Sequence, residues 1–173
     1  MELCDLYCAD RSLSGQIIPR DSVVPENRYR LIVHLCIFNS RGEMLIQQRQ
    51  STKSAWPDLW DFSVGGNATH GEDSATAIER ETEEELGLSL NFHGIRPYFT
   101  INFETGFDDF YLIIKDLAPE TLRLQPEEVQ AIKWATREEI LQLWEQGKFM
   151  HYYPSLIHFL FDTRGVYGSH QRD

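Results

Sequence analysis

Three glutamates near the middle of the chain have the spacing of a metal site. Glu81, Glu84 and Glu85 stand at positions i, i+3 and i+4, so in a helix they share an arc of about 100°. Like charges at this spacing destabilise a helix, and a hard divalent cation removes the repulsion. Mg²⁺ and Mn²⁺ prefer oxygen ligands, and Mg²⁺ is commonly shared between carboxylates and substrate phosphates. The spacing predicts a divalent-metal site, whereas the acidic composition alone is equally typical of a solvated helix face.

A helix must position these carboxylates, and the neighbouring residues predict one over residues 72–86. Side chains that can face a core recur there at helical spacing and form one stripe beside the glutamates: Ala75, Ile78, Thr82 and Leu86. Gly87 predicts the end of the helix, because glycine readily adopts a left-handed backbone. Arg80 precedes Glu84 by four residues, so the two side chains can form an ion pair.

The composition restricts the class of partner. The chain has 173 residues, with 16 Lys and Arg against 27 Asp and Glu, and a formal net charge of −11. Such a chain repels polyanions, so we expect neither a nucleic-acid polymer nor a membrane as partner. The acidic N-terminus and the lack of a long apolar run predict a cytoplasmic protein, and three cysteines without metal-type spacing predict reduced thiols.

The remaining segments predict a mixed α/β (α+β) architecture in one domain. Apolar runs bounded by turn residues predict strands, near residues 3–9, 31–38, 43–49, 60–64, 95–103, 107–116 and 129–134. A loop is expected over residues 19–27, and helices are expected after a capping box at Thr136 and over residues 155–161. We expect a single domain over residues 1–173, with a flexible tail at 165–173.

The segment from residue 66 to 88 resembles the Nudix box. Gly66-Asn-Ala-Thr-His-Gly-Glu72, then seven residues, then Arg80-Glu-Thr-Glu-Glu-Glu-Leu-Gly-Leu88 matches G-x5-E-x7-R-E-U-x-E-E-x-G-U, where U is apolar. Only the first U departs from the pattern, as Thr82. The resemblance implies an α/β/α sandwich with a mixed sheet and a Mg²⁺ or Mn²⁺ requirement. It also implies hydrolysis of a small molecule in which a diphosphate is linked to another group.

The same resemblance assigns roles to the residues of the box. Three glutamate side chains and one backbone carbonyl would bind the metal: Glu81, Glu84, Glu85 and the carbonyl of Gly66. Glu72 and Gly87 would support the loop and helix, and Arg80 would hold them together and assist catalysis. Water would attack phosphorus with metal assistance. Glu81 is a candidate ligand or general base, and acids elsewhere are alternative bases: Glu104, Asp108, Asp109, Glu127 and Glu128.

The flanking sequence is similar to isopentenyl diphosphate isomerases, which share the Nudix fold, over roughly residues 28–90. In those enzymes a basic pair that matches Arg49 and Lys53 binds the substrate diphosphate, and a carboxylate of their site aligns near Asp109. These three residues are therefore candidates for substrate binding and for an additional ligand or base. An ordinary surface position is the alternative for the two cations.

The isomerase chemistry itself is not expected. The isomerase catalytic cysteine falls at Gly65, and two of its metal-binding histidines fall at Asn67 and Arg30. We therefore expect a hydrolase of a nucleoside diphosphate derivative or similar small molecule. Isomerase-like activity and a non-catalytic nucleotide- or diphosphate-binding module are the alternatives, and a homodimer is the default expectation for the oligomeric state.

Overall fold

The computed structural model describes residues 2–170, which divide into two compact units. The first unit ends at residue 35 and resumes over residues 64–111, and the second holds the remainder. Strands β3 (Arg30–Phe38) and β8 (Gly106–Ile114) each have residues in both units. Of the predicted tail, residues 165–170 contain no helix or strand, and residues 171–173 lie outside the described residues. The prediction of a single domain stays a prediction.

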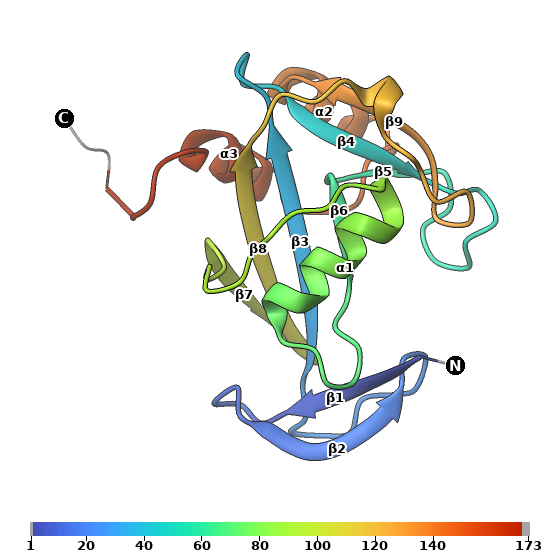
Figure 1. Cartoon of the computed structure of the whole chain (residues 1–173), viewed down its shortest axis with the longest axis vertical. Helices are drawn as coiled ribbons and strands as arrows, with labels where there is room; N and C mark the ends of the chain where they lie inside the picture. Colours follow the sequence, from blue (N-terminus) through green and yellow to red (C-terminus); the bar gives the residue numbers. More distant parts are fainter. Residues whose placement is uncertain (1, 171–173) are drawn as a thin grey trace. The chain divides into compact units, whose positions relative to one another are not determined.

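The first unit combines a hairpin, a mixed sheet and one helix. Its elements, besides parts of β3 and β8, are β1 (Leu3–Tyr7), β2 (Leu13–Pro19), β6 (Val64–Asn67), α1 (Ser74–Leu86) and β7 (Phe99–Phe103). Strands β1 and β2 pair with each other as an antiparallel sheet of their own. The order of the other strands is β6-β3-β8-β7, in which β6 and β7 are antiparallel to their neighbours. Strands β3 and β8 point the same way (Figure 1), so the sheet is mixed.

Helix α1 begins and ends on local signals. The carboxylate of Asp73 accepts a hydrogen bond from the backbone N–H of Thr76 at 2.8 Å, which satisfies one of the unpaired donors of the first turn. Gly87 has φ of 62°, and its N–H donates to the carbonyl of Glu83 at 2.9 Å. The predicted helix and its end at Gly87 are confirmed, and the helix packs against β6.

The second unit holds the remaining strands and helices. They are β4 (Met44–Arg49), β5 (Trp60–Asp61), the 3-10 helix η1 (Pro119–Thr121), β9 (Val129–Ala135), α2 (Arg137–Glu145) and α3 (Pro154–Thr163). Strand β4 pairs antiparallel with both β5 and β9. The predicted capping box is confirmed, since Thr136 and Glu139 each bond the other's backbone N–H. Aromatic rings contribute to its core, as where Phe38 meets Phe161 edge to face at 5.1 Å.

Two predictions about strands were wrong. Strand β2 lies where no strand was expected, because its side chains are mostly exposed and its apolar pattern is weak. The single strand expected over residues 60–64 is instead two strands, and Gly65 and Gly66 lie inside β6 rather than after it. A Cβ on Gly65 would lie 3.0 Å from Nδ1 of His34, so close packing against β3 explains a glycine within this strand. The mixed α+β class is confirmed.

Candidate active site

The last turns of α1 hold three carboxylates in different environments. Glu81 and Glu85 are 8% and 4% exposed, whereas the side chain of Glu84 is 48% exposed. All three lie toward the C-terminal end of the helix, which carries partial negative charge, and the last turn contains no basic residue. A cation supplied from outside the last turn therefore stabilises this arrangement.

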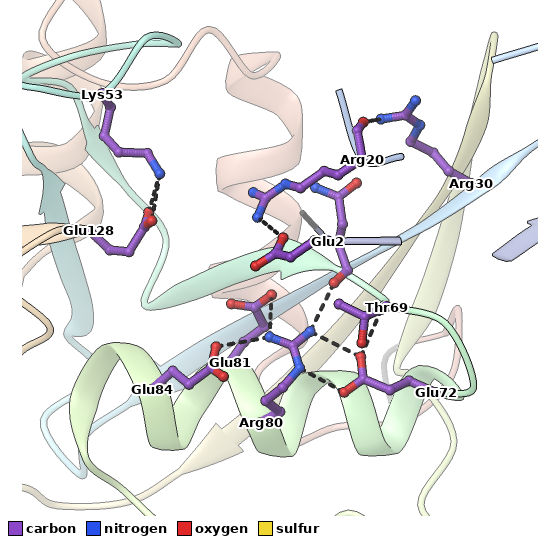
Figure 2. Close-up of polar contacts among 11 residues, drawn as sticks. Glu2, Arg20, Arg30, Lys53, Thr69, Glu72, Arg80, Glu81, Glu84 and Glu128 are labelled. Atoms are coloured by element: carbon purple, nitrogen blue, oxygen red, sulfur yellow. Dashed lines mark hydrogen bonds and ion pairs between the residues drawn. The ribbon is translucent and has the colours of Figure 1, made fainter. Parts of the chain in front are cut away.

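In the structure that cation is the guanidinium of Arg80 (Figure 2). Its Nη1 lies 3.0 Å from Glu81 and 2.9 Å from Glu84, so the predicted pair with Glu84 is present. Its Nε donates to Glu72 at 2.7 Å, and its Nη2 donates to the backbone carbonyl of Asn67 at 3.0 Å. The hydrogen bond to Glu72 is the largest cause that raises the pKa of Arg80 above its ordinary value. Arg80 thus joins the loop before α1 to the carboxylates on it.

Glu72 also holds the loop before α1 in place, by a hydrogen bond within the loop. Its carboxylate accepts the backbone N–H of Thr69 at 2.8 Å in addition to the bonds from Arg80. Burial would raise the pKa of Glu72, but the hydrogen bonds from Arg80 and Thr69 outweigh it, so the pKa is lowered. The carboxylate is therefore held in its charged form, and the loop over residues 68–72 is fixed against the helix.

Glu81 is packed against a residue that has no side chain. A Cβ placed on Gly66 would overlap the carboxylate of Glu81, so this close approach requires glycine. Burial raises the pKa of Glu81 to about 7, although Arg80 acts in the opposite direction. A carboxylate with this pKa can exchange a proton near neutral pH, and in its charged form it is a strong oxygen ligand.

This contact makes a specific prediction for Gly66→Ala. The added methyl group must displace the Glu81 carboxylate, so we expect hydrolytic activity to fall about 10- to 100-fold while the protein stays folded. Gly65→Ala is the matched control, because successive strand residues point to opposite faces, so its methyl group points away from Glu81 and meets the ring of His34 at 3.0 Å instead. Steady-state rates and thermal unfolding of both variants check the prediction, and equal loss of activity in the two would contradict it.

The two cations predicted to bind substrate belong to the second unit and already have partners there. Lys53 Nζ lies 2.6 and 2.5 Å from the two carboxylate oxygens of Glu128 (Figure 2). Arg49 donates from Nη2 to the backbone carbonyl of Ala55 at 3.2 Å. Their role in binding substrate stays a proposal, and for Lys53 it requires exchange of Glu128 for a phosphate.

Asp109 is buried and forms an ion pair with Arg11, whose side chain is partly exposed. It is 0% exposed, and Arg11 holds both its oxygens at 2.8 and 2.7 Å, while the hydroxyl of Thr100 donates at 2.5 Å. Burial would raise the pKa of Asp109, but the hydrogen bonds from Arg11 and Thr100 lower it overall. We therefore propose a structural role for Asp109 in place of the base or ligand that the sequence predicted.

Asp109→Asn tests that role. We expect a loss of about 2 kcal/mol in the free energy of unfolding, because Arg11 would keep its charge beside a neutral amide, with kcat of the folded protein within about twofold. Chemical unfolding and steady-state kinetics supply the measurements. The double variant with Arg11→Gln should lose less stability than the sum of the single variants. A stable Asp109→Asn protein without activity would restore the catalytic assignment.

Comparison with known proteins identifies the family. The model of the NUDIX domain matches residues 28–153, which includes the loop and helix described above. The chain belongs to the Nudix hydrolase family. It is 42% identical over 153 residues to a protein of Listeria monocytogenes named as an uncharacterized Nudix hydrolase, and the match covers 88% of this chain and 90% of the relative.

Isomerase relatives and solved structures also match. An isopentenyl-diphosphate Delta-isomerase of Citrobacter koseri is 30% identical over 114 residues, or 61% of each chain. The crystal structure of the protein DR0079 of Deinococcus radiodurans is similar with a TM-score of 0.73 and 25% identity, over 92% of this chain and 99% of the other. Membership in the Nudix hydrolases makes the protein an enzyme that acts on small, diphosphate-containing substrates. Within residues 2–170, no helix has the length and apolar character needed to cross a membrane.

Nudix hydrolases typically use divalent metals such as Mg²⁺, and the box of this chain offers suitable donors. Its acids are hard oxygen ligands, and Gly66 brings backbone into contact with Glu81. No three His, Cys, Asp or Glu side chains of residues 2–170 are gathered into a ready site, and Arg80 pairs with Glu81 and Glu84. The residues fit a divalent ion provided that Glu84, which is half exposed, leaves Arg80.

Sequence reasoning missed the contacts that the β1–β2 hairpin makes with this Nudix domain. Asp5 bonds Gly71 of the box loop across 66 positions, and Arg11 pairs with Asp109 across 98. No local pattern marks such residues, because each is an ordinary surface charge until the chain folds. The similarity to isomerases began at about residue 28, so it carried no signal for the hairpin.

Proposed function

We propose that this chain is a divalent-metal-dependent hydrolase that cleaves the diphosphate linkage of a nucleoside diphosphate derivative or similar small molecule by attack of water on phosphorus. The observation that carries the proposal is the arrangement of Glu81 with Glu84 and Glu85 on α1. Buried and exposed carboxylates stand together there beside a loop that Arg80 holds in place. Such a set suits a divalent cation and a substrate that brings phosphate oxygens to it.

Each residue has a distinct part in this proposal. The side chains of Glu81, Glu84 and Glu85 and the carbonyl of Gly66 would hold Mg²⁺ or Mn²⁺. The bound metal would neutralise charge on the phosphate and lower the pKa of the attacking water. Glu81 serves either as a ligand or as the proton acceptor, for which a pKa of about 7 is suited. Arg80, released by Glu84 but still bonded to Glu72, keeps the box loop aligned with α1.

The first unit supports hydrolysis over isomerisation. Isomerisation needs a proton donor and an acceptor on opposite faces of the carbon skeleton, and strand β6 has Gly65 where the isomerase resemblance places its cysteine. At the position of one metal-binding histidine, the guanidinium of Arg30 donates to two backbone carbonyls at 3.0 and 2.9 Å. A guanidinium cannot ligate a cation, so this isomerase ligand has no counterpart here.

A hydrolysis screen tests the proposal. Nucleoside diphosphate derivatives, sugar nucleotides, dinucleotides and prenyl diphosphates would each be incubated with Mg²⁺ or Mn²⁺, and phosphate-containing products quantified. We expect turnover of at least one class that a chelator abolishes and added metal restores. Label from deuterated water entering isopentenyl diphosphate would support the isomerase alternative instead. Tight ligand binding without turnover at any divalent metal would support a non-catalytic binding module.

A further inference from the structure

The N-terminal hairpin is fastened to the Nudix box loop, although it lies outside residues 28–153 that match the family model. The carboxylate of Asp5 on β1 accepts the N–H of Gly71 at 2.7 Å and pairs with Nδ1 of His70 at 2.9 Å. The backbone N–H of His70 donates in turn to the carbonyl of Leu3 at 2.7 Å. The hairpin therefore has a fixed position relative to the loop that precedes α1.

Arg30 fixes the segment that leaves this hairpin. Its Nη1 donates to the backbone carbonyl of Arg20 at 3.0 Å, and its Nη2 donates to that of Ser22 at 2.9 Å. The N–H of Arg20, just after β2, also donates to the carbonyl of Glu2, just before β1, at 2.9 Å. The backbone of Arg20 is thus held from two sides, which limits the positions that its side chain can reach.

The side chain of Arg20 extends toward the carboxylates of the box. Figure 2 shows its guanidinium on the side of Glu81 that faces away from α1. Arg20 is one of the cations whose charge lowers the pKa of Glu81, against the larger effect of burial. The guanidinium also pairs with Glu2 at 2.6 Å, and the two side chains are 37% and 53% exposed. Arg20 is therefore an accessible cation on the side of Glu81 that faces away from α1.

We propose that Arg20 binds a phosphate group of the substrate and that Glu2 occupies the guanidinium until the substrate displaces it. This inference rests on the proposed function, since it requires a diphosphate at the box. An ion pair between exposed side chains is weak, so Glu2 is readily exchanged. A phosphate carries more charge than a carboxylate and accepts two parallel hydrogen bonds from a guanidinium. The N-terminal hairpin thereby supplies both a substrate-binding residue and a competitor for it.

The exchange makes opposite predictions for the two partners of one ion pair. The probe is imidodiphosphate, whose nitrogen bridge resists hydrolysis, and its dissociation constant is measured by calorimetry with Mg²⁺ present. Arg20→Gln should weaken binding about tenfold, and Arg20→Lys should restore part of it. Glu2→Gln should tighten binding about threefold, because the competing carboxylate is removed. Arg28→Gln is the matched control. It also removes one positive charge from the segment between β2 and β3, and it should bind imidodiphosphate like the wild type.

The outcomes separate this inference from the function on which it rests. If Arg20→Gln and Glu2→Gln both weaken binding, the pair only supports the hairpin, and the inference is wrong. Thermal unfolding of each variant confirms that it is folded before its binding is compared. Wild-type protein that binds no imidodiphosphate with Mg²⁺ would overturn the inference together with the proposed metal site. Wild-type binding that Arg20→Gln leaves intact would overturn the role of Arg20 alone.

Discussion

Glu84→Gln is expected to lower metal-dependent hydrolysis about 10³-fold while the protein stays folded. Loss of a carboxylate ligand removes several kcal/mol of transition-state stabilisation, and each tenfold in rate corresponds to about 1.4 kcal/mol. The cost in stability is small, because Glu84 is half exposed and pairs with Arg80 at 2.9 Å, an i,i+4 pair of the kind that contributes about 0.3–0.5 kcal/mol. Rates at saturating Mg²⁺ and thermal unfolding midpoints measure the two effects.

Glu83→Gln is the matched control for this experiment. Glu83 is exposed on the same helix turn and undergoes the same change in charge, but its position on the helix points away from the three candidate ligands. We expect its activity within about twofold of the wild type. Full activity of Glu84→Gln would remove Glu84 from the set of ligands. Equal losses in the two variants would show that the helix contributes general negative charge rather than a defined ligand.

The second large effect is a dependence of stability on pH that comes from Glu81. Its pKa is about 7 in the folded protein against an ordinary value of 4.5, so folding favours its protonated form. The stabilisation is fully present below about pH 4.5 and is lost as the pH rises through 7, where the buried carboxylate must be charged. The difference between the folded and the ordinary pKa of Glu81 corresponds to about 3 kcal/mol in the free energy of unfolding of the metal-free protein.

Glu81→Gln isolates this contribution from those of other carboxylates. Glu72 and Asp109 have lowered pKa values, so they stabilise the fold as pH rises and partly mask the effect in the wild type. The variant should therefore gain stability relative to the wild type between pH 5 and pH 8, as followed by chemical unfolding with a chelator present. An equal difference between the two proteins at both pH values would contradict a buried, titrating Glu81.

Metal addition should offset most of that loss of stability in the wild type. A divalent ion binds the charged carboxylate, so Mg²⁺ should stabilise the wild type at pH 8, by about 2.7 kcal/mol when present at 100 times its dissociation constant. Glu81→Gln should gain much less from the same addition. Wild-type stability that does not respond to Mg²⁺ or Mn²⁺ at pH 8 would contradict the proposed set of ligands.

Local sequence signals account for the helix and its immediate surroundings. Spacing of apolar residues and Gly87 predicted α1 almost to its ends, since capping and amphipathic packing act within a few residues. The pairing of Arg80 with Glu84 followed from the same geometry, because side chains four positions apart lie on one face. The two glycines of β6 were not expected inside a strand, because the sequence does not show that His34 and Glu81 crowd them from other elements.

By itself, the sequence determined the family, through a box of charged residues at set spacing. Membership in that family in turn determined the class of activity, hydrolysis of diphosphate-containing molecules. The tertiary structure decided the state of those charges. It buried Glu81 beside Gly66 and so raised its pKa, paired Asp109 with Arg11, and brought the hairpin that Arg20 follows to the box loop. These outcomes depend on burial and on contacts between residues far apart in the chain, and neither is set by local spacing.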